Sequence, residues 1–176
     1  MKYAIIYGVL SGAVIASVIT AGLVLGPQNS IFSSMWFGYL VMFVALSFVF
    51  MGVKRYRDVE KGGVIRFLPA LGMGVAIAVV AALAYILVWE IYLASTGYRF
   101  MDEFLAAMAR GLEAQGKSAG EVAAEMAEFQ WMRENYGNPL IRVPMTFLEI
   151  FPVGLIMALF SAAVLRNSRV LPARAA

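Results

Sequence analysis

The sequence predicts an all-α fold: an integral membrane four-helix bundle with an external amphipathic helical hairpin between helices three and four. The first observation is four apolar runs, at residues 5–25, 37–53, 67–93 and 143–165, that are almost free of charge. Each is about long enough to cross a ~30 Å hydrocarbon layer as a helix. The second is composition: the 176 residues are 62% hydrophobic and 14% charged. The third is a helical spacing of apolar residues between 98 and 137. We expect one membrane domain, residues 1–176.

The four runs differ in detail. The first, residues 4–25, exceeds the core of about 7–15 residues in a signal peptide, so we expect a membrane helix there. The second is short, and the third is longer than a minimal crossing. Small residues recur every four positions in the first, third and fourth runs. They are Gly8, Gly12 and Ala16; Ala70, Gly74, Ala78 and Ala82; and Gly154, Ala158 and Ala162. Such stripes predict close helix packing, within the bundle or against a second protomer.

Residues 98–137 read as two amphipathic stretches. The first ends near Gly116, and Ser118 with Glu121 has the pattern of a capping box that opens the second. The second runs to about Asn135, before the Gly137-Asn138-Pro139 sequence. Glutamates share one side of it, which we interpret as a solvated face rather than a cation site.

Basic residues predict the orientation, because Lys and Arg accumulate on the cytoplasmic side. The loop after the second run carries five of them: Lys54, Arg55, Arg57, Lys61 and Arg66. The C-terminal tail adds Arg166, Arg169 and Arg174, whereas residues 26–36 carry no charge and residues 94–139 hold seven acids against four bases. We expect a multi-pass protein of the bacterial inner membrane with both termini in the cytoplasm. The basic loop is interpreted as an orientation signal, with a dedicated lipid or protein site as the alternative. Trp36 and Trp89 fit an interfacial aromatic belt.

Four polar residues form a candidate intramembrane site. Glu90 lies near the outer end of the third run, and Glu149 lies inside the fourth. Arg142, Thr146 and Glu149 are spaced to share one helix face, where Glu90 of the preceding antiparallel helix comes within reach of Arg142. Because ionisable groups in lipid are costly, they pair, line a wet cavity or are protonated. Two interpretations follow: a structural lock, or an outward-facing ion or proton site.

Several segments resemble one family. They read F-M-G-V-K-R-Y-R-D at residues 50–58, G-G-V-I-R-F at 62–67, V-W-E-I-Y at 88–92, N-P-L at 138–140 and E-I-F-P-V-G at 149–154. The chain is similar to the domain of unknown function 4199 family over nearly its whole length, least so in residues 98–137. The resemblance implies a four-helix protein of bacterial membranes, mostly inner membranes. It implies no activity and assigns no catalytic residue.

The chain has no cysteine and no histidine. That excludes disulfides, thiolate nucleophiles, imidazole bases and the usual zinc and haem ligands, so we expect no metal and no cofactor. The basic residues lie in loops rather than in a nucleic-acid patch. We expect a non-enzymatic polytopic membrane protein whose partners are the bilayer and either itself or another membrane protein, as a subunit or scaffold. The alternative is a small transporter or channel subunit using Glu90, Arg142 and Glu149. A lipid-modifying enzyme is a third reading, weakened because no nucleophile–base pair is visible.

Overall fold

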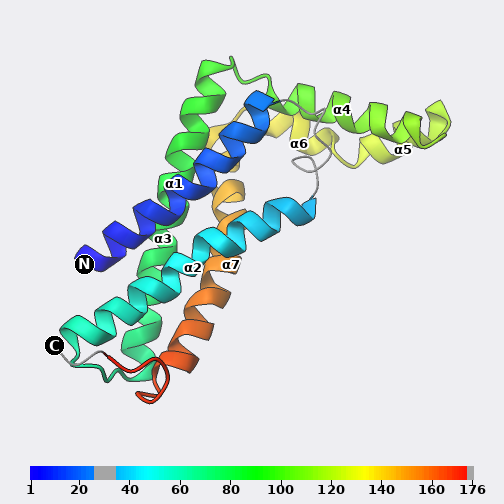
Figure 1. The fold of residues 1–176 in the computed structure, drawn as a ribbon. Helices are drawn as coiled ribbons and strands as arrows, with labels where there is room; N and C mark the ends of the chain where they lie inside the picture. The colour runs from blue at the N-terminus through cyan, green and yellow to red at the C-terminus, as the bar shows by residue number, and fades with distance from the viewer. Residues whose placement is uncertain (26–34, 174–176) are drawn as a thin grey trace. The chain divides into compact units, whose positions relative to one another are not determined.

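A computed structural model describes residues 1–25 and 35–173 (Figure 1). The described chain forms seven helices: α1 (Lys2–Leu25), α2 (Met35–Glu60), α3 (Phe67–Ser95), α4 (Phe100–Ala114), α5 (Ala119–Ala127), α6 (Gln130–Asn135) and α7 (Pro139–Leu165). No strand occurs in these residues, so the all-α prediction is confirmed. Most of the uncharged loop expected after the first helix, and Arg174 of the tail, lie outside the described residues.

Three helices are long and apolar enough to cross a membrane: Trp36–Glu60 of α2, and the whole of α3 and α7. In α1 the apolar stretch found among the described side chains is Lys2–Val18, which is shorter. This set of helices is typical of a membrane protein. The fourth crossing stays a prediction.

The chain forms two compact units. The first unit comprises Met1–Val88 and Phe147–Ala176, and the second unit comprises Trp89–Thr146. Helices α3 and α7 contribute residues to both. This division leaves the prediction of a single membrane domain open.

Small residues lie where the helices of the first unit meet. A methyl group on Gly12 of α1 would lie 2.8 Å from the carbonyl oxygen of Ala81 in α3. A methyl group on Gly74 of α3 would lie 2.8 Å from the Cβ of Ala158 in α7. Neither position has room for a larger side chain without a shift of the neighbouring helix. The stripes predicted from sequence therefore include positions of close backbone approach, which is how helices pack without a hydrophobic force between them.

Three distant parts of the chain meet at one end of the first unit. The Lys2 ammonium at the start of α1 lies 2.9 Å from the Glu60 carboxylate at the end of α2, and the Tyr3 hydroxyl donates to the same carboxylate at 3.1 Å. The Arg57 guanidinium near the end of α2 donates to the carbonyl oxygens of Val170, at 2.9 Å, and Leu171. The C-terminal segment, red in Figure 1, therefore lies beside the end of α2, as the start of α1 does.

Helix α2 is longer than the sequence predicted. The expected end was near residue 53, where the apolar run stops, but the helix continues through the basic segment to Glu60. Lys54 and Asp58, one turn apart, form an ion pair of 2.6 Å that supports the extra turns. The helix then ends at Gly62 and Gly63, both with positive φ, and the Gly63 N–H donates to the Arg57 carbonyl oxygen at 3.0 Å. Glycine adopts this left-handed backbone without the steric cost that a Cβ atom would bring.

The second unit contains α4, α5 and α6, and α4 contacts α5 (Figure 1). Met101, Leu105 and Val122 are buried there. The predicted capping box is present: Ser118 caps α5 and accepts from the Glu121 N–H, while the Glu121 carboxylate accepts from the Ser118 N–H at 2.8 Å. The second stretch, however, is not one helix to Asn135. It divides at residues 128 and 129, where tighter i to i+3 hydrogen bonds separate α5 from α6.

Candidate functional site

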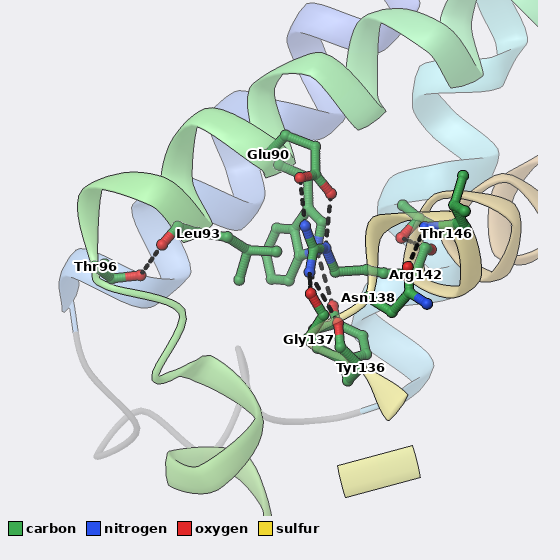
Figure 2. Close-up of polar contacts among 10 residues, drawn as sticks. Glu90, Leu93, Thr96, Tyr136, Gly137, Asn138, Arg142 and Thr146 are labelled. Atoms are coloured by element: carbon green, nitrogen blue, oxygen red, sulfur yellow. Dashed lines mark hydrogen bonds and ion pairs between the residues drawn. The ribbon is translucent and has the colours of Figure 1, made fainter. Parts of the chain in front are cut away.

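The candidate site is a buried arginine in the second unit. Arg142, in the first turn of α7, makes a bidentate ion pair with Glu90 of α3: Nε lies 2.8 Å from one carboxylate oxygen, and Nη2 lies 2.6 Å from the other (Figure 2). The Arg142 side chain is 1% exposed and that of Glu90 is 27% exposed. This geometry is the strong form of an ion pair, because two parallel charge-assisted hydrogen bonds fix both groups.

The other terminal nitrogen of Arg142 donates to backbone carbonyl oxygens. Nη1 donates to the carbonyl oxygens of Tyr136, at 2.8 Å, and Gly137, at 3.2 Å. The rings of Tyr98 and Tyr136 lie 5.1 and 5.7 Å from the guanidinium carbon, within the range of cation–π attraction. Arg142 thereby ties α3 to the turn that precedes its own helix. We call Arg142, Glu90 and the Tyr136 and Gly137 carbonyls the Arg142 clamp.

Local sequence places the clamp residues. Asn138 precedes α7, and its side-chain oxygen accepts from the Leu140 N–H at 3.0 Å, so the helix starts at Pro139, where the missing N–H is harmless. The Thr146 hydroxyl donates to the Arg142 carbonyl oxygen at 3.0 Å, one turn along α7. At the other side, α3 ends in a turn through Gly97 and Tyr98, both with positive φ. That turn brings the Tyr98 ring to Arg142.

An aromatic cluster adjoins the clamp. The Trp89 N–H donates to the Tyr136 hydroxyl at 3.0 Å, and the Trp89 ring meets Phe100 edge-on with centroids 4.8 Å apart. Trp89 also stacks on Tyr92 at 5.3 Å. Trp89 is only 8% exposed, so it is a core residue of the second unit rather than the membrane-interface residue that its sequence position suggested. Trp36, in contrast, is 83% exposed.

The second unit also has a groove that the sequence did not predict. Its volume is about 610 Å³, and it is formed by α4, α5 and α6. Its lining residues are Asp102, Leu105, Ala123, Met126, Ala127, Phe129, Gln130, Arg133 and Glu134. An Asp102–Arg133 ion pair of 3.1 Å joins two of these helices, with both side chains about two-thirds exposed. No sequence signal marks this groove, because it depends on the break between α5 and α6.

The four predicted site residues divide between the two units. Glu90, Arg142 and Thr146 are brought together in the second unit, and Glu149 belongs to the first. Glu149 lies on the exposed side of α7. Among the described residues, its carboxylate has no hydrogen bond or ion pair. The structure therefore brings three predicted residues together, two of them in the Arg142 clamp, and leaves Glu149 as a separate carboxyl group.

The basic residues of the loop after the second apolar run differ in their exposure. Arg55, Lys61 and Arg66 are exposed, and Lys54 is half-buried in its pair with Asp58. Arg57 is fully buried, with its Nε donating to Asp58 at 2.7 Å and its other nitrogens to the carbonyls of the C-terminal segment. Arg57 is thus committed to internal contacts rather than to lipid headgroups. A basic residue in a charged loop gave no sign of this burial.

No metal site is formed by the described residues: no three Asp or Glu side chains are placed to hold an ion. Every buried side-chain nitrogen or oxygen of the described chain has a hydrogen-bond partner. The polar groups of the clamp and of Arg57 are therefore satisfied within the protein.

The three long apolar helices are typical of a helical membrane protein. The family described as protein of unknown function (DUF4199) matches residues 2–167, and the chain belongs to that family. The resemblance predicted from the sequence is therefore confirmed. No curated protein and no solved structure is significantly similar to the chain.

Proposed function

We propose that this chain is a non-enzymatic protein of the bacterial inner membrane that crosses the bilayer four times and acts by association, with itself or with another membrane protein. The even number of crossings rests on the first unit. The start of α1, the end of α2 and the C-terminal segment meet at one end of it through Lys2–Glu60 and Arg57–Val170. The basic loop and the basic tail then share one side, which the distribution of positive charge places in the cytoplasm.

The observation that carries the non-enzymatic role is the state of the Arg142 clamp. Its guanidinium gives two hydrogen bonds to Glu90 and two to backbone carbonyls, and it is 1% exposed. A guanidinium that binds a substrate or an ion needs free donors facing a cavity. The clamp therefore supports the structural lock rather than the transport alternative.

Association is tested by the mass of the purified protein in lipid nanodiscs and by chemical cross-linking in native membranes. We expect either a defined oligomer or one stoichiometric membrane partner, retained at low protein concentration. A strict monomer in nanodiscs, together with no cross-linked species in native membranes, would contradict the proposal. Proton or solute flux in liposomes that depends on Glu90 or Arg142 would favour the transport alternative.

A further inference from the structure

One side of helix α7 is largely exposed in the described chain. Within the first unit its exposed residues are Leu148, Glu149, Pro152, Ile156, Leu159, Phe160 and Ala163; the Phe160 ring also lies 6.1 Å from that of Phe50 in α2. These positions recur every three or four residues, so they share one side of the helix. The opposite side, which includes Ile150, Gly154 and Ala158, is buried. We call the exposed side the Glu149 face.

Glu149 is the one ionisable residue on this otherwise apolar face. It lies ten residues after the start of α7 and sixteen before its end, about 15 and 24 Å along the axis, so neither end of the helix is within its reach. Its neighbours on the face are large and apolar: Leu148 is 64% exposed and Ile156 is 63% exposed. A carboxyl group facing hydrocarbon without a partner costs several kcal/mol, roughly as much as any unsatisfied polar group in lipid.

Several other polar side chains within the apolar helices have partners. The Ser11 hydroxyl of α1 donates to the Ala45 carbonyl oxygen of α2 at 2.9 Å, and the Ser161 hydroxyl donates within α7 at 2.6 Å. Glu90 and Arg142 satisfy each other. Glu149 has no such bond among the described residues, so its partner must come from outside them.

A second copy of the chain supplies such a partner. Copies inserted in the same orientation carry Glu149 at the same depth, and a two-fold axis along the bilayer normal sets each residue of the contact against its equivalent. A neutral carboxyl group is both a donor and an acceptor, so it is complementary to itself. A foreign helix would have to bring a matching polar group to this depth. Building on the proposed association in the membrane, we propose that the Glu149 face binds a second copy of this chain, with the two Glu149 carboxyl groups hydrogen-bonded to each other.

The natural chain has no cysteine, so single-cysteine variants report contacts cleanly. Ile156 is two turns from Glu149 on the same face, so the proposal predicts that Ile156→Cys forms a disulfide-linked dimer on mild oxidation in native membranes. The matched control is Leu83→Cys on α3, which is similarly exposed at 55% and lies on a different helix. We expect the control to give little dimer. Equal cross-linking of the two variants would overturn the proposal.

The role of the carboxyl group is tested in the Ile156→Cys background. Glu149→Gln keeps a donor and an acceptor and should retain the dimer, whereas Glu149→Leu should lower the dimer fraction about tenfold, as loss of a hydrogen bond between membrane helices does. The Gln variant keeps the test valid if the Leu variant fails to fold. Retention of the dimer by a folded Leu variant, or its loss in the Gln variant, would contradict the carboxyl pairing. A nanodisc oligomer without Ile156→Cys cross-links would refute the Glu149 face and leave the proposed function standing, whereas a strict monomer without partners would refute both.

Discussion

At the scale of single residues, each unit contains one buried arginine that connects distant parts of the chain within that unit. Arg142 joins α3 to the turn before α7, and Arg57 joins the end of α2 to the C-terminal segment. Both combine a carboxylate with backbone carbonyls, so each guanidinium is satisfied without water. A buried charge of this kind stabilises little by its presence but is costly to leave unpaired.

Glu90→Ala should destabilise the second unit, because it leaves the 1% exposed guanidinium of Arg142 without its anion. We expect a loss of about 3 kcal/mol, and partial recovery when Arg142→Met removes the charge as well. The measurement is unfolding of the purified protein in detergent. The control is Glu103→Gln, whose carboxylate is exposed and 3.9 Å from Arg99, with an expected effect below about 1 kcal/mol. Equal effects of Glu90→Ala and the control would show that the clamp is not structural.

Arg57→Met should release the C-terminal segment, because the carbonyls of Val170 and Leu171 lose their donors. Tryptic cleavage after Arg166 and Arg169 should then be about tenfold faster, since cleavage follows the population of the opened segment. The control is Arg55→Met. Arg55 lies two residues before Arg57 in α2 and is exposed, so this substitution should leave the cleavage rate unchanged. An unchanged rate in Arg57→Met would mean that other contacts hold the segment.

At the scale of helices, packing and capping decide where elements begin and end. Hydropathy predicted the apolar helices, and the S-A-G-E sequence predicted the start of α5. The sequence did not predict the last turns of α2. Those turns depend on the Lys54–Asp58 ion pair and on the burial of Arg57 by a segment over a hundred residues away. Nor did it predict the break after Ala127, for which the sequence has no glycine or proline signal. Glu90 with Arg142 was foreseeable from antiparallel neighbours, whereas the burial of Trp89 depends on a tertiary cluster.

Gly12→Ala should destabilise the first unit, because the added methyl would lie 2.8 Å from the Ala81 carbonyl oxygen and 2.7 Å from the Ala84 Cβ. We expect a loss of about 1–3 kcal/mol, typical of overpacking. Gly72→Ala is the matched control: it is also helical and has nothing within 4 Å of an added methyl. That control should stabilise by up to about 1 kcal/mol through helix propensity. Equal effects would show that α1 and α3 do not approach closely.

The cap of α5 should depend on pH. The Ser118 hydroxyl and N–H donate to the Glu121 carboxylate and hold the pKa of that carboxyl below its usual value. Because the folded-state pKa is the lower one, the stabilisation is complete above the unfolded-state value of about 4.3 and disappears as the pH falls through the folded-state pKa. The protection of the α5 amides against hydrogen exchange, relative to unstructured amides at the same pH, should therefore fall in acid. Ser118→Ala removes the hydroxyl donor but keeps the backbone N–H, so it should weaken that dependence and cost about 1 kcal/mol at neutral pH. Protection of α5 that stays constant as the pH falls would contradict the cap's role.

At the scale of the whole molecule, the orientation of every loop depends on how often the chain crosses the membrane. The apolar runs and the charge asymmetry predicted four crossings, and the structure describes three helices long enough, with a shorter apolar stretch in α1. The meeting of the start of α1, the end of α2 and the C-terminal segment supports an even number. Sequence alone could not supply this, because it requires contacts between residues 2 and 60 and between residues 57 and 170.

The most direct test is side-specific labelling of single cysteines in spheroplasts with a membrane-impermeant maleimide. Gln115 lies in the turn between α4 and α5 and Ser168 lies in the C-terminal segment, and both are exposed. If the chain crosses four times, Gln115→Cys is labelled in intact spheroplasts and Ser168→Cys is labelled only after the membrane is opened. Labelling of both variants in intact spheroplasts, or of Ser168→Cys alone, would contradict four crossings with the basic ends inside.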